Sequence, residues 1–291
     1  MKALIFGANG QDGYYLSQQC REIGIESIGI SRSGNWYHGD VSNYQQVKQL
    51  IQYYTPNYVF HLAANSTTRH ETLFENHQTI STGTLNILES VYKYTPKTKV
   101  FIAGSGLQFE NKGEPITEET PFAATSPYSI SRIQSVYAAR YYRSLGVPIY
   151  VGYLFHHESP LRKPSHVSQK IIQAVKNIAL NKQDHFELGD ILVEKEWTFA
   201  GDIVNGILTL VKQDNIFEAI IGSGVAYSIE YWLEECFQLI GKDWHNHVIL
   251  QKDFISEYKC LLSDPQVLKS MNWEPTISIS DLARMMMEYH D

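Results

Sequence analysis

The stretch Gly7-Ala-Asn-Gly-Gln-Asp-Gly13 decides the fold of this chain. It follows an apolar run, Ala3–Phe6, and leads into a helical pattern, Gly13–Ile23. In such a strand–turn–helix unit the first glycine allows a tight turn, and the third lets the helix pack closely on the strand. The stretch therefore predicts the first strand and first helix of a parallel sheet.

The middle glycine, Gly10, predicts a ligand. Without a side chain it lets a phosphate group approach the backbone, and the helix that follows offers N–H groups and a partial positive charge. A turn of this kind at the start of a βαβ unit indicates dinucleotide binding. A glycine-rich turn without a ligand is the alternative.

Strands and helices alternate through the first 155 residues. The expected strands are too apolar for a half-exposed sheet, which indicates that helices cover both faces. They are Ala3–Phe6, Ser27–Ile30, Tyr58–Leu62, Val100–Ala103 and Ile149–Tyr153. The expected helices are Gly13–Ile23, Tyr44–Tyr54, Thr72–Tyr94 and Pro127–Leu145. This order predicts an α/β fold with a Rossmann-type, doubly wound parallel sheet.

The pattern changes after Tyr153, where a polar segment with two prolines begins. Further helices are expected at Val167–Leu180, Ile203–Val211, Ile229–Ile240 and Ile279–Tyr289. We expect residues 1–155, with a return segment at about 198–220, to form the dinucleotide-binding domain. Residues from about 156 to 197 and from 221 to 291 are expected to form a smaller C-terminal lobe that binds the substrate.

The composition excludes several classes of protein. With 31 acidic and 24 basic residues the net charge is −7, which gives no reason to expect nucleic-acid binding. The three cysteines form no CxxC pair, which indicates a reducing compartment. The histidine pairs lack further ligands at metal-binding spacing, and no apolar run is long enough to span a bilayer. We expect a cytoplasmic protein without a metal or a membrane partner.

The end of the second expected strand indicates which dinucleotide binds. An Asp or Glu at this point binds the ribose 2′-hydroxyl of NAD, and this chain has neither. It has Arg32 between two serines, and a guanidinium group suits a 2′-phosphate. We therefore expect NADP rather than NAD, with a solvated loop arginine as the alternative.

Three polar residues indicate a reaction at a carbonyl group. Ser105 follows the strand Val100–Ala103, and Tyr128 and Arg132 share a helix face because they are four residues apart. A serine hydroxyl and a tyrosine phenol can converge on one carbonyl oxygen, and a nearby cation assists the phenol in giving or taking a proton. We predict that these three residues are catalytic.

Further segments make the chain resemble a known family. They are Gly7–Gly13, Gly39-Asp40, Leu62–Ser66, Thr120–Phe122, Ser126–Tyr128, Leu154–Pro160, Val167–Ile171 and Ser263–Pro265. In this order, over nearly the whole chain, they resemble the extended short-chain dehydrogenase/reductase superfamily and, within it, the GDP-mannose 4,6-dehydratase family. The His-Glu-Ser-Pro segment is specific to the dehydratase branch, whereas the glycine-rich loop is common to the superfamily.

The resemblance implies an NADP-binding domain, a lobe that holds a nucleotide-sugar, and a three-step reaction. Hydride leaves sugar C4, water is lost across C5–C6, and hydride returns to C6. With Arg32 included, the residues expected at the cofactor are Gly7, Gly10, Gln11, Asp12, Gly13, Arg32, Asp40, Val41, Leu62, Ala63, Ala64, Asn65, Ser66, Tyr128, Arg132, His157 and Arg162. Those expected at the substrate are His156, Glu158, Lys170, Lys195, Trp197 and Glu257.

The chain departs from the family's pattern at the reacting end. Where the family has Thr, one residue and Glu, this chain has Ser105, one residue and Leu107. Ser105 can supply a hydroxyl, but Leu107 has no group that removes the C5 proton. A shifted counterpart, Gln108 or Glu110, would revive dehydration. Arg132 replaces the superfamily's lysine with a larger cation that does not deprotonate.

The expected substrate pocket departs as well. The family's Asn before His-Glu-Ser-Pro is His156 here, and its Lys-Arg-Asp-Trp segment is Glu194–Trp197. A family Arg falls on Phe254, while Glu257 matches. Lys195 can still pair with a diphosphate, but one phosphate contact is lost, which leaves the base open.

Two classes of hypothesis follow. The first is an NADP-dependent oxidoreductase that reduces a 4-keto sugar nucleotide, with a GDP-linked sugar favoured; a dehydratase or epimerase is the alternative. The second, motivated by Arg132 and Leu107, is a pseudoenzyme that binds NADP and a nucleotide-sugar. The resemblance also implies that copies pair through the helices Thr72–Tyr94 and Pro127–Leu145. The tyrosine-rich face of the second helix fits such pairing, so we expect a homodimer or homotetramer.

Overall fold

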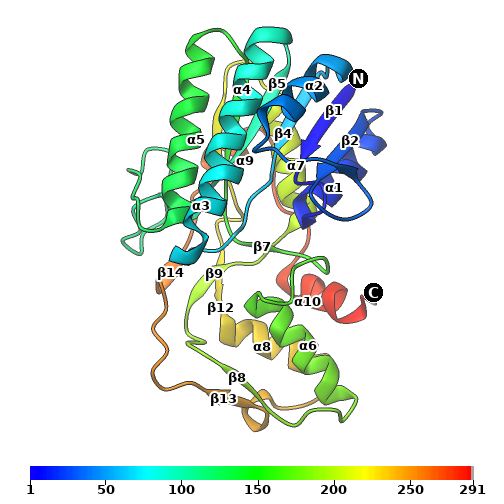
Figure 1. Ribbon diagram of the computed structural model, residues 1–291. Helices are drawn as coiled ribbons and strands as arrows, with labels where there is room; N and C mark the ends of the chain where they lie inside the picture. The colour runs from blue at the N-terminus through cyan, green and yellow to red at the C-terminus, as the bar shows by residue number, and fades with distance from the viewer. Residues whose placement is uncertain (290–291) are drawn as a thin grey trace.

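The structure is a computed structural model and describes residues 1–289. A large parallel sheet lies at its centre, with strand order β11-β6-β5-β4-β1-β2-β3 (Figure 1). Its strands are β1 (Lys2–Phe6), β2 (Glu26–Ser31), β3 (Tyr37–His38), β4 (Tyr58–His61), β5 (Lys99–Ser105), β6 (Ile149–Leu154) and β11 (Glu218–Ile221). The doubly wound α/β fold expected from the sequence is confirmed.

Helices cover both faces of this sheet. One face packs against α2 (Tyr44–Tyr54), α4 (Gly83–Tyr94) and α5 (Pro127–Ser144). The other packs against α1 (Gln11–Glu22), α7 (Ala200–Val211) and α9 (Gln266–Lys269). Every residue of β1 after Lys2 is buried, as expected for an apolar strand between two helical layers.

Local signals set the ends of α5. The Ser126 hydroxyl accepts a hydrogen bond from the Ser129 N–H at 3.1 Å, and the Ser129 hydroxyl receives one from the Ser126 N–H at 2.9 Å. Pro127 occupies the first turn, where no N–H is needed. Gly146 follows the last turn with φ of +94°, the left-handed conformation that ends many helices.

The segment expected as one helix, Thr72–Tyr94, is divided. It comprises a 3₁₀ turn η1 (His70–Thr72), α3 (Leu73–Asn76), a π-helical segment η2 (His77–Thr82) and α4. The π-helical segment packs on α5, where the Ser81 hydroxyl bonds to Gln134 Oε1 at 2.8 Å. Tertiary contacts with α5 therefore accompany a change of helical pitch that periodicity alone does not reveal.

A smaller lobe lies at one end of the sheet, in the lower half of Figure 1. Its core lies between α6 (Val167–Ala179), α8 (Ile229–Gln238) and α10 (Ile279–Glu288). Short strands complete it: β7 (His157–Glu158) pairs with β10 (Thr198–Phe199), β8 (Phe186–Leu188) with β13 (Val248–Leu250), and β9 (Glu194–Glu196) with β12 (Ala226–Ser228) and β14 (Cys260–Leu261). Two further 3₁₀ turns are η3 (Gly106–Gln108) and η4 (Trp244–Asn246).

The topology positions a site between the sheet and the lobe. From β1 the chain adds β2 and β3 on one side of the sheet, and from β4 it adds β5, β6 and β11 on the other side. The connections after β1 and β4 therefore leave on opposite faces. Crevices at the carboxyl ends of strands at such a point are the usual ligand sites of open α/β sheets. The loops after β1, β4, β5 and β6 all reach this edge.

Candidate active site

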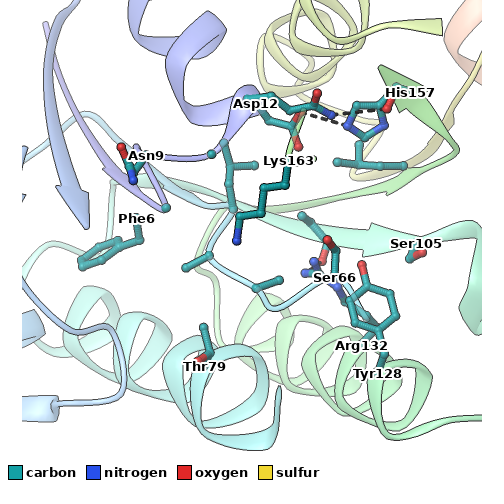
Figure 2. Close-up of a pocket in the computed structure, with 18 of the residues that line it drawn as sticks. Phe6, Asn9, Asp12, Ser66, Thr79, Ser105, Tyr128, Arg132, His157 and Lys163 are labelled. Atoms are coloured by element: carbon teal, nitrogen blue, oxygen red, sulfur yellow. Dashed lines mark hydrogen bonds and ion pairs between the residues drawn. The ribbon is translucent and has the colours of Figure 1, made fainter. Parts of the chain in front are cut away.

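A cavity of about 360 Å³ opens at the carboxyl ends of β1, β4, β5 and β6. Figure 2 shows the residues of α5 entering it from one side and the glycine-rich loop from the other. Most of the expected site residues line it: Gly7, Gly10, Gln11, Asp12, Arg32, Asp40, Val41, Leu62, Ala63, Ala64, Ser66, Ser105, Tyr128, Arg132, His156, His157 and Arg162. The fold thus brings together side chains spread over more than 150 residues of sequence.

The three glycines of the first loop differ in their surroundings. Gly7 has φ of +95°, and a Cβ there would lie 2.6 Å from the Ala63 nitrogen. A Cβ on Gly13 would lie 2.4 Å from the Gly7 oxygen, so this glycine is required for packing. A Cβ on Gly10 would meet only the Gly7 oxygen, at an ordinary 3.4 Å. The protein itself therefore has room for a side chain at Gly10, on the cavity side.

One end of the cavity carries Arg32 at the end of β2. Its guanidinium donates to Glu75 of α3 at 3.1 Å, and Glu75 also receives the Asn65 amide at 2.9 Å. These two hydrogen bonds lower the pKa of Glu75. Asn65 does not line the cavity, and its amide orients the Glu75 carboxylate instead. Its place after the strand Tyr58–Leu62 had not indicated this role. Arg32 therefore meets a carboxylate at the position expected to receive a phosphate.

The glycine-rich loop is joined to the lobe by buried polar contacts. Asp12 Oδ1 lies 2.9 Å from His157 Nε2, and the Ser159 hydroxyl donates to Gln11 Oε1 at 2.9 Å. The carbonyl oxygen of Phe155 lies 2.6 Å from His157 Nδ1, which must therefore carry a proton. Burial disfavours the charged form of both residues, but their mutual attraction and hydrogen bond outweigh it. The pKa of Asp12 is therefore lowered and that of His157 is raised.

The other end of the cavity holds the expected catalytic residues (Figure 2). Tyr128 and Arg132 project from α5, with the guanidinium carbon 5.1 Å from the centre of the tyrosine ring. Arg132 is 4% exposed; it donates to the Ala103 carbonyl, and its Nε has no partner among the described residues. The Ser105 hydroxyl accepts from the Leu107 N–H at 3.2 Å, which leaves its own hydrogen free to donate.

No carboxylate lines this reacting end among the residues that the structure describes. Leu107 occupies the wall beside Ser105. Gln108 is fully buried with its Oε1 on the Ser105 N–H at 2.9 Å. Glu110 lies outside the cavity, 3.0 Å from Lys112. Neither residue is thus positioned to act as a base at this end of the cavity.

The lobe contributes a group of charged residues. Lys195 Nζ lies 3.0 Å from His156 Nε2, and Glu158 Oε1 lies 2.9 Å from the same nitrogen. Arg162 Nε lies 3.5 Å from the other oxygen of Glu158. Burial lowers the pKa of Lys195 to about 8, and burial together with the Lys195 charge lowers that of His156 to about 4. Glu158 is completely buried beneath the cavity wall.

A second cavity of about 230 Å³ lies farther into the lobe. Lys195, Phe254 and Glu257 line it, and Tyr258 lines both cavities. Glu257 is hydrogen-bonded to Thr68 from the loop after β4, so this contact connects the large domain and the lobe. The two cavities are adjacent and meet at Tyr258 and the His156–Lys195 pair.

Two expected substrate residues lie elsewhere. Trp197 is 3% exposed and stacks on Trp232 with ring centres 4.7 Å apart, so it belongs to the lobe core. Contrary to the expectation, it supports Lys195, whose Nζ lies 4.7 Å from its ring centre. Lys170 donates to the Glu187 carbonyl at 2.6 Å and lines neither cavity. Sequence position near the site did not reveal which way these side chains would turn.

Several polar residues of the cavity were not among the expected site residues. They include Asn9, Thr68, Thr79, Lys163, His166 and Tyr258. Figure 2 shows Lys163 reaching into the cavity from the loop after β7. Its position directly after Arg162 was the available signal, since consecutive cations are typical of phosphate sites.

Residues 1–289 contain no cluster of three or more histidine, cysteine, aspartate or glutamate side chains arranged to hold a metal ion. Within the same range, no helix has the length and apolar character needed to cross a membrane.

Known proteins are similar to this chain in sequence or in fold. GDP-mannose 4,6 dehydratase 1 of Arabidopsis thaliana is 28% identical over 98% of this chain and 88% of its own. The GDP-mannose 4,6-dehydratase of Vibrio cholerae is 25% identical over 98% of this chain and 92% of its own. Among solved structures, RMD from Pseudomonas aeruginosa complexed with NADPH superposes with a TM-score of 0.87 at 18% identity. The superposition covers 98% of this chain and 97% of RMD.

A UDP-glucose 4-epimerase from Thermotoga maritima, solved with UDP-glucose, shows the same fold with a TM-score of 0.86. It is 19% identical and covers 99% of this chain and 98% of its own. Residues 4–286 match the family described as GDP-mannose 4,6 dehydratase, which is nearly the whole chain. The chain belongs to the GDP-mannose 4,6-dehydratase family of nucleotide-sugar-modifying enzymes.

Proposed function

We propose that this protein is an NADPH-dependent reductase of a 4-keto sugar nucleotide, with a GDP-linked sugar favoured. The observation that carries the proposal is the reacting end of the cavity. It presents a phenol, a serine hydroxyl and a guanidinium, but Leu107 stands where a dehydratase needs a base. Reduction of a carbonyl requires a proton donor and no base at C5.

The residues present fit a nicotinamide dinucleotide. Gly10 leaves its cavity side open for a phosphate, and the first turn of α1 directs N–H groups there. The partnerless Nε of Arg132 is a buried donor that a ribose hydroxyl would satisfy. We favour NADP because Arg32 ends β2, although Glu75 beside it opposes a 2′-phosphate. Related structures carry NADPH or NAD, the former in RMD.

The protein's own groups supply the proton and the charge. When bound, the reduced cofactor supplies the hydride. Tyr128 gives its phenolic proton to the substrate oxygen, and the Ser105 hydroxyl donates a hydrogen bond to that oxygen. Arg132 lies against the Tyr128 ring and stabilises the phenolate that forms. Leu107 and Phe155, which line the same wall, limit access of water.

The substrate is proposed to extend through both cavities. The base and ribose would occupy the second cavity near Phe254 and Glu257, and the diphosphate would pass Lys195. The sugar would then reach Ser105 and Tyr128. Residues 1–155 with the return segment 198–220 would hold the cofactor, and the remainder would hold the nucleotide-sugar. The names of the relatives, most of them acting on GDP-mannose, favour a guanine base.

We also propose a homodimer. Tyr137 and Tyr141 on α5 are 59% and 60% exposed, and Tyr92 and Leu85 on α4 are also exposed. Neighbouring helices that present an aromatic and apolar face are typical of an interface between copies.

The test is oxidation of NADPH in the presence of enzymatically prepared GDP-4-keto-6-deoxymannose, followed at 340 nm. We expect consumption that Tyr128→Phe abolishes, while NADPH binding, measured by its fluorescence, is retained. GDP-mannose with NADP⁺ should give no 4-keto product, and its formation would favour the dehydratase. Bound NADPH with no consumption for GDP-, dTDP-, UDP- and CDP-linked ketosugars would instead identify a pseudoenzyme.

A further inference from the structure

His156 lies where the two cavities meet. It lines the first cavity, and its Nε2 lies 3.0 Å from the Nζ of Lys195, which lines the second. A ligand that occupies both cavities must pass this pair. In a nucleotide-sugar the part between base and sugar is the diphosphate, so its charge would lie beside Lys195; this step depends on the function proposed above.

One ring nitrogen of His156 has a fixed proton. Its Nδ1 lies 2.7 Å from the carbonyl oxygen of Glu196, and a carbonyl can only accept. The Glu196 side chain is held in turn by the N–H groups of Ser223 and Ser263, at 2.5 and 2.7 Å. Because Nδ1 must donate, only Nε2 can change its protonation.

Nε2 of His156 faces two partners with opposite requirements. The ammonium of Lys195 at 3.0 Å can only donate, and Glu158 Oε1 at 2.9 Å can only accept while ionised. An unprotonated Nε2 therefore accepts from Lys195, and a protonated Nε2 donates to Glu158. The nitrogen can satisfy one of these partners at a time.

Both distances allow a hydrogen bond, but burial and the adjacent Lys195 charge keep Nε2 unprotonated, which corresponds to the first arrangement. Lys195 donates to Nε2, and neither oxygen of Glu158 receives a hydrogen bond from any residue between 1 and 289, although Glu158 is fully buried. Such a carboxylate is costly until a donor reaches it. The other charged and titratable groups facing this cluster are Arg162, with His166 and Lys163 beyond it. The low pKa of His156, about 4, agrees with a neutral ring here.

We propose that His156 takes up one proton when a ligand's diphosphate draws Lys195 away from it. The ammonium then donates to a phosphate oxygen, and Nε2 loses its donor. A proton from solvent binds Nε2, and the new N–H donates to Glu158. The imidazolium adds a positive charge next to the diphosphate, so affinity for the nucleotide-sugar rises as the pH falls through the neutral range.

The family residue at this position provides a matched variant. The resemblance places asparagine there, and an amide can bridge the same groups but cannot gain a proton. His156→Asn is therefore expected to fold and to bind without proton uptake. His245→Asn, at an exposed histidine of η4, serves as the control.

The experiment is calorimetric titration of the full-length protein with GDP-mannose and with UDP-glucose at pH 7, in buffers of low and high ionisation enthalpy. Both phosphates of these probes are diesters that keep their charge near neutral pH, so the buffer dependence reports the protein. We expect uptake of about one proton per ligand for wild type and His245→Asn, and about zero for His156→Asn. The ¹⁵N resonance of Nε2 should move to its protonated position when ligand is added.

The outcomes separate this inference from the proposed function. Binding with equal heats in both buffers, and an unchanged Nε2 resonance, overturns the proton uptake and leaves the reductase proposal standing. No binding of either probe overturns the proton uptake, and NADPH consumption with the ketosugars then decides the reductase proposal separately. If His156→Asn fails to fold, the resonance of the wild-type ring decides the question by itself.

Discussion

Oδ1 of Asp12 lies 2.9 Å from Nε2 of His157, although 145 residues separate them. Asp12 belongs to the glycine-rich loop at the start of α1, and His157 begins β7 in the lobe segment. Their ion pair fixes the loop against the connection that leads from the large sheet into the lobe. A cofactor loop anchored in this way loses little further freedom when a ligand binds.

This ion pair predicts a defined pH dependence of stability. The raised pKa of His157 stabilises the folded protein below about pH 6.5. This stabilisation is lost as the pH rises through the pKa that His157 has in the folded protein. The lowered pKa of Asp12 stabilises the folded protein above about pH 3.9. This stabilisation is lost as the pH falls through the pKa that Asp12 has in the folded protein. Asp12→Asn should therefore cost about 3 kcal/mol of unfolding free energy at pH 5.5 and less at pH 9. Urea unfolding at both pH values checks this, and equal costs would contradict the ion pair.

The glycines predict two different effects of adding a methyl group. Gly13→Ala should destabilise the fold by about 2 kcal/mol or more, because the new Cβ would lie 2.4 Å from the Gly7 oxygen. Gly10→Ala should change stability by less than about 0.5 kcal/mol. It should nevertheless weaken NADPH binding at least about tenfold, since its Cβ enters the cavity. Thermal unfolding and NADPH fluorescence measure the two effects; unaltered NADPH affinity in Gly10→Ala would refute the phosphate site.

Arg132 can be compared directly with the lysine it replaces. Arg132→Lys should keep the rate of ketosugar reduction within about tenfold, because a cation remains beside Tyr128. Arg132→Met has similar length but no charge, and should lower kcat by about 100-fold. Steady-state NADPH oxidation gives both values, with circular dichroism as the check on folding. Equal losses in the two variants would show that charge is not what Arg132 supplies.

Glu75 is expected to weaken the preference for NADP. Its carboxylate holds Arg32 at 3.1 Å and would repel a 2′-phosphate bound to the same guanidinium. Glu75→Gln should raise the ratio of NADPH to NADH affinity about tenfold, and Arg32→Ala should lower it. Fluorescence titrations with both cofactors provide the ratio. Weaker NADPH binding by Glu75→Gln would mean that the carboxylate assists the cofactor.

The proposed dimer can be tested by charge at its centre. The double variant Tyr137→Lys and Tyr141→Lys should give a monomer by light scattering at micromolar concentration, since like charges would meet across the interface. Leu180→Lys is the matched control, because Leu180 is 62% exposed and follows α6 in the lobe, away from α4 and α5. A monomeric wild-type protein would refute the proposal.

Features set by neighbouring residues could be predicted from the sequence. The glycine-rich turn, the alternation of apolar strands with helices and the Ser126 cap depend on local conformation. The shared face of Tyr128 and Arg132 depends only on helical periodicity. Many of the expected site residues lie at strand ends or at helix starts. Their meeting at one place could also be predicted, because parallel strands bring these ends to one edge.

Other features depend on which side chains meet across long sequence separations. Glu75 of α3 meets Arg32 at the end of β2, 43 positions earlier in the chain, and Trp197 turns into the lobe core because Trp232 stacks on it. The partners of His156 come from two strands: Glu158 from β7, and the Lys195 side chain and Glu196 carbonyl from β9. The sequence determined the sheet and which loops meet at its edge, since these follow from short-range patterns. Only the packing of the lobe on that edge decided which charges are paired, because each pairing requires both partners in place.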